Sequence, residues 1–251
     1  MSKNFTFHLV RNSSTRLKNK SLIHLGQYKV IEHSILRARY YGFIPIICTS
    51  KNKTDDVYDS IGKKYKINVF RGSLNNKLKR IQDCSKYFKI DYFHTVDVDD
   101  PFFDPVQIKK SLKLLKDKKY DIVLPSSLSS SGLASEGISF NSRSIQDKID
   151  TRYTNNIEMI DKYLHISKSI KSCKLPSHYY YKIKARLTLD YIEDYTFLNA
   201  LCSIAGNFAN RKKIEKIINM NTDLAKINLF RNKHWKNRQN IIIKNEKKNI
   251  I

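Results

Sequence analysis

The sequence predicts an α/β fold in which a mostly parallel sheet is covered by helices on both faces. Two observations lead to this prediction. Short apolar runs of strand length alternate along the chain with segments whose apolar residues have helical spacing. Polar segments rich in Arg, Lys or Asp directly follow several of these runs, as expected where ligands bind beyond the carboxyl ends of parallel strands.

The first β-α-β unit starts with the apolar run Phe5 to Val10. Its helix extends from Tyr28 to Arg39, because Val30, Ile31, Ile35 and Leu36 recur at helical spacing. The same alternation continues as far as Leu124. We expect further strands at Ile44 to Thr49, Ile67 to Phe70, Tyr92 to Val96 and Asp121 to Leu124, with helices at about Asn75 to Phe88 and, started by a proline, at Pro105 to Lys118.

The second half of the chain has a less regular pattern. We predict a Ser-rich loop, two strands, two helices and a basic tail that is helical at first and then frays. No internal repeat is visible. We divide the chain into a domain of residues 1–205 and a basic, partly helical C-terminal extension of residues 206–251. In chain order these segments are the loop Pro125 to Leu133, a strand at Glu136 to Phe140, a helix at Asn155 to Ile170, a strand at Tyr179 to Leu189, a helix at Ile192 to Ala205, the tail from Asn210 and its frayed end from Asn240 to Ile251.

The composition is that of a globular protein with a strong positive charge. Of 251 residues, 41% are hydrophobic and 28% charged, and 47 Lys and Arg against 23 Asp and Glu leave a formal charge of +24. This charge favours an anionic partner. The lysines are spread along the whole chain, as codon bias in an AT-rich genome would also produce, so we expect no nucleic-acid partner. The same positive charge would attract a nucleoside triphosphate or an acidic sugar.

The cysteines and the termini exclude other classes. Cys48, Cys84, Cys173 and Cys202 form no C-x-x-C pair, so we expect buried thiols, at Cys48 and Cys202 in particular, and neither disulfides nor a metal site formed by cysteines. The N-terminus lacks the apolar core of a signal peptide, and no run approaches the ~20 apolar residues of a membrane helix. We therefore expect a cytoplasmic protein without a membrane partner.

The polar loop after the first strand carries the first functional signal. Arg11, Ser14, Thr15, Arg16 and Lys20 could cradle a triphosphate, with hydroxyl and backbone N–H groups on the phosphates and cationic groups offsetting the charge that develops on pyrophosphate. The alternative is a solvated basic loop. The loop lacks the spacing of a P-loop, so it would be a different phosphate-binding device.

Carboxylates after later strands carry the second signal. If the chain is extended, Asp97 and Asp99 point to the same side, as suits a hard cation that also holds phosphate oxygens. For Asp104, directly before Pro105, we predict a helix N-cap instead. Asp190 precedes another predicted helix, so it is either an N-cap or a metal ligand. Asp100 lies in the same cluster, where helix capping and solvation are again the alternative.

The loop Arg11-x-x-Ser14-Thr15-Arg16-Leu17-x-x-Lys20 resembles the opening motif of the cytidylyltransferase family that activates acidic sugars. That family includes acylneuraminate and 3-deoxy-manno-octulosonate cytidylyltransferases and the related spore-coat polysaccharide proteins. The resemblance covers roughly residues 5 to 205. Further similar motifs follow in the same order: Leu25-Gly26, Val30-Ile31-Glu32, Thr49-Ser50 with Asp55-Asp56, Phe70-Arg71-Gly72-Ser73, Asp99-Asp100-Pro101 with Asp104-Pro105, and Thr188-Leu189-Asp190 with Glu193-Asp194.

The resemblance implies a Rossmann-like nucleotidyltransferase fold, CTP as donor, Mg²⁺ as cofactor and a homodimer as a candidate assembly. By position, Asp99 and Asp190 match the metal ligands, and Glu136 matches an acidic residue near the sugar. The remaining matches form the nucleotide site: Arg11, Ser14, Thr15, Arg16 and Lys20 in the triphosphate loop, and Arg71 and Ser73 in a nucleotide-contacting turn. The loop departs from the family pattern in having Lys18-Asn19 where Pro-Gly is common and no Gly-Gly before Ser14.

These observations predict transfer of CMP from CTP to a nonulosonic or octulosonic type of sugar acid, for surface glycan biosynthesis. The sugar hydroxyl attacks the α-phosphorus in line and expels pyrophosphate, and Arg16, Lys20 and Asp99 carry most of the catalysis by positioning and charge stabilisation. Asp97 is a candidate general base. Arg186 and His178 are candidates to bind the sugar carboxylate, with surface solvation as the alternative for each.

Two other functions stay open at the level of sequence. In a metal-dependent glycosyltransferase, Asp97-Val98-Asp99 would be the D-x-D motif that holds a nucleotide sugar. The triphosphate loop argues against that class, since a diphosphate-sugar donor has less need of it. A basic non-catalytic module that binds nucleic acid or another polyanion would lose affinity steeply with salt and would not depend on Asp99.

Overall fold

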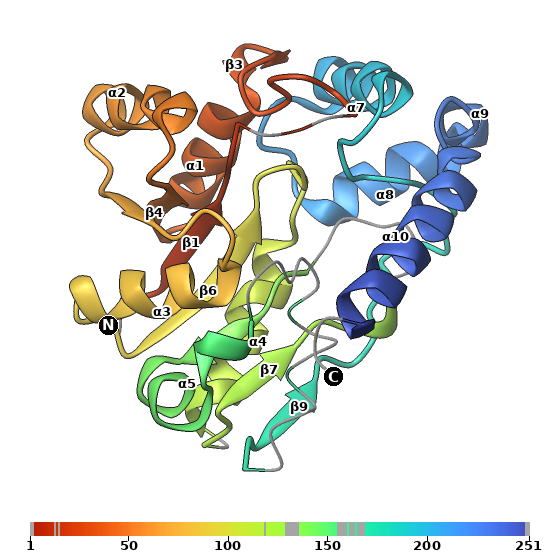
Figure 1. The fold of residues 1–251 in the computed structure, drawn as a ribbon. Helices are drawn as coiled ribbons and strands as arrows, with labels where there is room; N and C mark the ends of the chain where they lie inside the picture. Colours follow the sequence, from red (N-terminus) through yellow and green to blue (C-terminus); the bar gives the residue numbers. More distant parts are fainter. Residues whose placement is uncertain are drawn as a thin grey trace.

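The computed structural model describes residues 3–12, 14, 16–117, 119–128, 136–154, 160, 164 and 169–248. Within these residues a seven-stranded sheet forms the centre of the fold (Figure 1). Neighbouring strands are parallel except where β8 pairs with β6 and β7, so the prediction of a mostly parallel sheet is confirmed. In sheet order the strands are β5 (Val69–Gly72), β4 (Ile44–Ser50), β1 (Phe5–Leu9), β6 (Tyr92–Asp97), β8 (Ser139–Asn141), β7 (Ile122–Leu124) and β9 (Ser172–Lys174).

Helices cover both faces of the sheet, as predicted. On one face α3 (Lys77–Tyr87) and α5 (Ser142–Lys148) share a core with the side chains of Phe7 and Phe93. The other face is covered by α1 (Val30–Tyr40), α2 (Val57–Tyr65), α4 (Pro105–Asp117) and α7 (Ile192–Ala205), and α8 (Arg211–Met220) and α9 (Thr222–Lys226) share the core of α7. Helix α10 (Arg231–Lys248) follows α9 along the chain. Shorter elements are the hairpin β2 (His24–Leu25) and β3 (Tyr28–Lys29) and the 3₁₀ turns Lys53–Asp55 and Thr151–Tyr153.

The direction of the strands determines where a site can form. Because β1, β4, β5, β6 and β7 all run the same way, their carboxyl ends meet at one edge of the sheet. The loop that contains Arg16 follows β1, and the turn that contains Asp99 follows β6. Gly137 brings the start of β8 to this edge as well. A Cβ on Gly137 would lie 1.9 Å from the carbonyl oxygen of Thr95, and its φ of +65° favours glycine.

The predicted strand at Tyr179 to Leu189 is wrong. The edge position beside β7 is taken by β9, which was not predicted from the sequence, and the segment Tyr179 to Leu189 pairs with no strand of the described sheet. Its backbone groups are satisfied in other ways. Glu215 accepts from the N–H groups of Tyr180 and Tyr181, and the N–H of Leu189 donates to the carbonyl of Asp99 at 2.7 Å.

The other predicted elements agree with the structure in outline. Helices α2 and α5 and the hairpin of β2 and β3 were not predicted from the sequence. Tyr28 and Lys29, predicted as the start of a helix, form β3, and the segment Asn240 to Lys248, expected to fray, belongs to α10. Most of the predicted helix at Asn155 to Ile170 lies outside the described residues. Residues of α7, α8 and α9 share one core cluster, which includes Leu198, Ile214 and Ala225. The division of the chain at residue 205 stays a prediction.

The predictions about cysteines and membrane helices can be compared with the structure. Cys48 and Cys202 are free and buried, as predicted. In the described part of the chain, no helix has the length and the apolar character that crossing a membrane requires.

Candidate active site

Two bonds fix the start of the loop after β1 at the carboxyl edge. The Arg11 guanidinium donates to the carbonyl of Leu74 at 2.7 Å, and the N–H of Asn12 donates to Asp55 Oδ1 at 2.7 Å. Both partners belong to loops that follow neighbouring strands. Of the other predicted loop residues, Ser14 is half-buried, and Thr15 lies outside the described residues.

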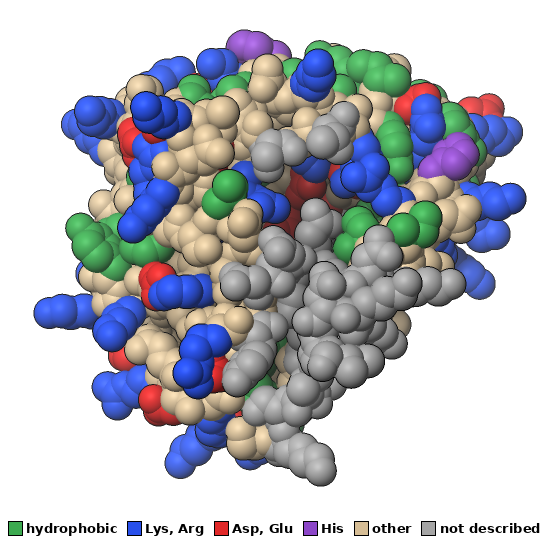
Figure 2. All heavy atoms as spheres, viewed as in Figure 1, with side chains coloured by type: hydrophobic (Ala, Val, Ile, Leu, Met, Phe, Trp, Pro, Cys, Tyr) green, Lys and Arg blue, Asp and Glu red, His purple; other side chains and the backbone are tan. Residues whose placement is uncertain are grey.

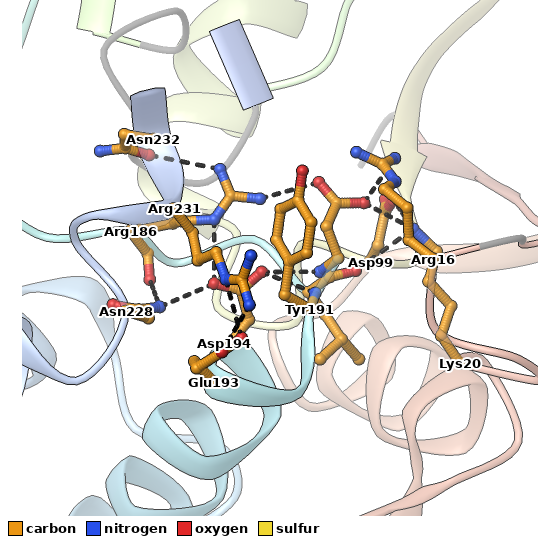
Figure 3. A network of polar contacts seen from close by, with 12 residues as sticks. Arg16, Lys20, Asp99, Arg186, Tyr191, Glu193, Asp194, Asn228, Arg231 and Asn232 are labelled. Atoms are coloured by element: carbon orange, nitrogen blue, oxygen red, sulfur yellow. Dashed lines mark hydrogen bonds and ion pairs between the residues drawn. The ribbon is translucent and has the colours of Figure 1, made fainter. Parts of the chain in front are cut away.

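The end of this loop brings two cationic side chains onto two carboxylates from distant parts of the chain (Figure 3). Lys20 Nζ lies 2.5 Å from Asp99 Oδ2 and 3.1 Å from Asp190 Oδ1, and it also donates to the carbonyl of Leu189 at 3.2 Å. Arg16 Nη2 lies 2.8 Å from the same Asp190 Oδ1. Arg16, Lys20, Asp99 and Asp190, predicted separately as site residues, therefore lie together.

Their environment strengthens these ion pairs. The side chain of Lys20 is 17% exposed, that of Asp99 28% and that of Asp190 3%. Burial alone would lower the pKa of Lys20, but the Asp99 and Asp190 carboxylates outweigh it and raise that pKa above its usual value. Burial likewise opposes ionisation of Asp99, and Lys20 nevertheless holds the pKa of Asp99 below the usual range. Lys20 and Asp99 are therefore both charged at neutral pH.

Asp190 is not the N-cap of the helix that follows it. The N-cap is Tyr191. Asp194, the third residue of the helix, completes the cap, because its Oδ2 accepts from the N–H groups of Asp190 at 2.9 Å and Tyr191 at 3.0 Å. The carboxylate of Asp190 is therefore not used by its own backbone. For Asp104 the capping prediction is confirmed, since its Oδ1 accepts from the N–H of Val106 at 2.9 Å.

Asp97 and Asp99 do not act as a pair. Strand β6 ends at Asp97, and Asp99 lies in the turn beyond it, so the extended geometry on which a shared side depended does not hold. Asp97 Oδ1 accepts from Lys77 Nζ at 2.9 Å, whereas Asp99 contacts Lys20. The second carboxylate at Lys20 is that of Asp190.

The predicted nucleotide-contacting turn lies at the carboxyl end of the edge strand β5, with Arg71 inside the strand and Ser73 directly after it. Arg71 contacts the carboxylates of Asp56 at 2.6 Å and Asp59 at 2.7 Å and donates to the carbonyls of Ser50 and Asn52. Ser73 accepts from the N–H of Asn76 at 3.1 Å, at the start of α3. Both residues thus stabilise loops at the carboxyl edge, and within the described part of the chain neither of them bonds to Lys20 or Asp99.

The candidates for sugar recognition lie in three different environments. Arg186 is fully buried beneath Asp190, so the alternative of a solvated side chain is wrong, and a direct bond to a sugar would require its present contacts to open. Glu136 is half-buried and accepts from the N–H of Ser126 at 2.6 Å, just beyond β7. His178 is exposed, with its ring against Tyr180.

Sequence reasoning missed the residues that hold Asp190 from behind. They are Asp194, named only within a motif, and Asn228 and Asn232 from the C-terminal segment. The four-residue spacing of Arg186, Asp190 and Asp194 was a visible signal. Nothing comparable marks the two asparagines, because they are more than 30 residues away in the chain.

The space-filling view shows the site from outside (Figure 2). Acidic side chains lie at the base of a hollow, and Lys and Arg side chains flank it. In the described residues no group of three or more His, Cys, Asp and Glu side chains could hold a metal ion by itself. Two carboxylates leave most positions of a Mg²⁺ ion to water and to substrate phosphates, which is how Mg²⁺ is usually bound at sites that transfer phosphoryl groups.

A mostly parallel sheet with cationic and acidic groups at its carboxyl edge defines an α/β protein of the nucleotidyltransferase type. The family model for cytidylyltransferases matches residues 9–163. The chain therefore belongs to the cytidylyltransferase family and is a CTP-dependent nucleotidyltransferase.

Sequence and structure comparisons agree with this assignment. The spore coat polysaccharide biosynthesis protein SpsF of Bacillus subtilis is 26% identical over 228 residues, 86% of this chain and 93% of SpsF. The 3-deoxy-manno-octulosonate cytidylyltransferase of Rickettsia peacockii is 30% identical over 118 residues, 46% of this chain and 48% of that protein. A solved cytidylyltransferase from Leptospira borgpetersenii superimposes with a TM-score of 0.73 at 20% identity, covering 89% of this chain and 95% of that one.

Proposed function

We propose that this protein transfers CMP from CTP to an acidic sugar of the nonulosonic or octulosonic type and releases pyrophosphate, as a cytoplasmic step of surface glycan biosynthesis. The observation that carries the proposal is the convergence of Arg16 and Lys20 on Asp99 and Asp190 at the carboxyl edge of the sheet. The names of two relatives support the substrate class, since one acts on 3-deoxy-manno-octulosonate and the other belongs to polysaccharide biosynthesis.

Mg²⁺ fits the donor set of this site. Asp99 Oδ2 and Asp190 Oδ1 are hard carboxylate oxygens from two separate segments, and both already contact one cation, the Lys20 ammonium. We propose that these two side chains hold the ion. When bound, the ion would neutralise charge on the phosphates and help to orient the triphosphate.

The residues of this chain supply positioning and charge. Arg16 and Lys20 belong to the triphosphate loop and lie at the acidic hollow seen in Figure 2, which we call the recess. We propose that both side chains turn from the carboxylates to the phosphate oxygens when CTP binds. There they would offset the charge that develops as pyrophosphate leaves. Arg11, Ser14, Thr15, Arg71 and Ser73 stay predicted nucleotide contacts, and Glu136 stays a predicted sugar contact.

Attack by the sugar hydroxyl requires a group that accepts its proton. Asp97 stays the candidate base. Its carboxylate contacts Lys77 at 2.9 Å and is 32% exposed, so a substrate hydroxyl is not barred from it by burial. A catalytic role for Asp97 predicts that Asp97→Asn lowers kcat and leaves metal affinity unchanged.

The structure does not favour the glycosyltransferase alternative. A D-x-D site needs Asp97 and Asp99 to act on one metal ion, whereas the two carboxylates contact different lysines. Membership of the cytidylyltransferase family also favours an enzyme over a non-catalytic binding module.

The test is pyrophosphate release with Mg²⁺, each of the four NTPs and a panel of sugar acids. We expect release with CTP and one class of sugar acid, and a loss of about 10²-fold or more for Asp99→Asn, because a charge that stabilises the transition state is removed. Asp83→Asn is the matched control, since Asp83 pairs with Lys79 on the exposed side of α3. If wild type releases no pyrophosphate with any pair of substrates, the proposal is wrong.

A further inference from the structure

The C-terminal segment reaches the active site from behind through a chain of buried polar contacts (Figure 3). The chain runs from Asp190 to Arg186, from Arg186 to Asp194, and from Asp194 to Asn228. Arg186 and Asp194 are fully buried, and Asn228 is as well. The segment after residue 210, to which the sequence assigned no function, therefore contacts the support of a proposed metal ligand.

The two oxygens of Asp190 have separate partners. Oδ2 accepts from Arg186 Nη2 at 2.8 Å on the buried side. Oδ1 accepts from Arg16 at 2.8 Å and Lys20 at 3.1 Å on the side of the recess. Arg186 thus fixes the rotation of the Asp190 carboxylate, so that one defined oxygen faces the recess.

Arg186 is itself held in place. Its Nε donates to Asp194 Oδ1 at 2.9 Å, and its Nη1 donates to Asn232 Oδ1 at 3.3 Å, at the start of α10. The guanidinium also lies 5.9 Å from the ring of Trp235. Three different groups of one planar guanidinium therefore connect Asp190 to α7 and α10.

Asn228 closes the chain of contacts. Its amide donates to Asp194 Oδ1 at 2.9 Å and to the carbonyl of Arg186 at 2.9 Å. One side chain thus holds both the backbone and the counter-charge of Arg186. Removing it would leave Asp194 with one fewer donor in a site without water access, where an unsatisfied acceptor is costly.

The charges at this site balance. Arg16, Lys20 and Arg186 face Asp99, Asp190 and Asp194, so three cationic groups meet three anionic groups. Arg186 is shared between Asp194 and Asp190 Oδ2, so Asp190 Oδ1 stays available to the recess. A change in either buried partner would alter the charge that Asp190 presents.

We propose that Asn228 is a positioning residue for the reaction, which acts through Asp194 and Arg186 to hold Asp190 Oδ1 toward the recess. This inference rests on the proposed function, in which Asp190 is a metal ligand. Groups that hold a metal ligand from behind typically change metal affinity 10–100-fold when they are mutated. Asn228 should therefore control metal affinity although it does not touch the metal, CTP or the sugar.

The test uses the full-length protein and measures Mn²⁺ binding by calorimetry in the presence of CTP, together with the magnesium dependence of pyrophosphate release. The variants are Asn228→Leu, which removes both bonds at similar volume, and Arg186→Lys, which keeps the charge but loses the planar fork. Asn221→Leu is the matched control, because Asn221 is exposed and its amide bonds only to the carbonyl of Ile217 within the same helical region. Thermal unfolding establishes which variants are folded.

We expect Mn²⁺ to bind about tenfold more weakly or worse to Asn228→Leu and Arg186→Lys and unchanged to Asn221→Leu. If Asn228→Leu does not fold, Arg186→Lys carries the test. If Asn228→Leu folds and binds Mn²⁺ as tightly as wild type, the inference is wrong and the proposed function stands. If only Arg186→Lys folds, wild-type affinity in that variant has the same meaning. Wild-type protein that neither binds Mn²⁺ nor releases pyrophosphate would overturn both, so the two failures are distinguishable.

Discussion

Arg71 and Arg186 each contact two aspartates, but they do so in opposite environments. The Arg71 side chain is 24% exposed, and its partners Asp56 and Asp59 are 62% and 40% exposed. Arg186 is 0% exposed, and its partners Asp190 and Asp194 are 3% and 0% exposed. The sequence predicted both arginines as ligand contacts.

The difference indicates separate roles for the two arginines. An exposed ion pair contributes little to stability, so Arg71 can exchange its aspartates for a ligand at small cost. A buried arginine that loses its partners leaves uncompensated charges in the interior. Arg186 is therefore suited to hold Asp190 in place, and Arg71 is suited to meet an incoming nucleotide.

The largest expected effect follows from breaking the buried side. Arg186→Met should lower the free energy of unfolding by about 3–5 kcal/mol, because Asp190 and Asp194 would be left without their buried counter-charge. Urea denaturation followed by circular dichroism measures this change. If this variant unfolds at the same urea concentration as wild type, the buried ion pairs of Arg186 do not stabilise the fold more than the exposed ion pairs of Arg71, and the proposed difference in roles is wrong.

Buried histidines extend the comparison to pH. Burial lowers the pKa of three histidines: His8 and His33 to about 3, and His94 to about 4. The charge of His94 lowers the pKa of His8 further, and the charge of Arg37 does the same for His33. The unfolded chain, with histidine near its ordinary pKa of 6.5, binds more protons than the folded one below that pH. Stability should be complete above pH 6.5 and should fall as the pH drops toward 4.

The expected slope is about 1.4 kcal/mol per pH unit for each of the three histidines. Urea denaturation at several pH values between 7 and about 4.5 measures it. The exposed His24 offers the control, because His24→Gln should leave the slope unchanged. A free energy of unfolding that stays flat over this range would show that these histidines are protonated in the folded protein.

The smallest effect on stability is expected on the exposed side. Arg71→Met should change the free energy of unfolding by less than about 1 kcal/mol. If Arg71 contacts the nucleotide as predicted, the same variant should raise the KM for CTP about tenfold, as expected for the loss of a hydrogen bond to a charged group. Initial rates of pyrophosphate release at varied CTP measure this, and an unchanged KM would remove Arg71 from the nucleotide site.

Local patterns predicted the first half of the fold well and the second half poorly. Up to Leu124, apolar runs alternate with helical spacing, and β1, β4, β5 and β6 pair in parallel as such an alternation predicts. The segment Tyr179 to Leu189 is apolar enough for a strand, but its backbone is held by Glu215 and Asp99 instead. Such pairing depends on which sheet edge is open, and a local pattern carries no information about that.

The site shows the same limit. The loop with Arg16 and Lys20 and the carboxylates of Asp99 and Asp190 follow recognisable motifs, and they lie together in the structure. The support from Asn228 could not be predicted, because an isolated asparagine in a basic tail has no distinctive spacing. Long-range packing brings it to Asp194.

The ion pairs that Arg16 and Lys20 form with Asp99 and Asp190 have a consequence for the effect of ionic strength. A nucleotide that enters this recess exchanges one set of partners for another and does not simply neutralise free positive charge. A chain with a formal charge of +24 should attract loosely bound polyanions in a way that weakens steeply with added salt. The affinity for CTP should depend on salt much less than this net charge alone would suggest.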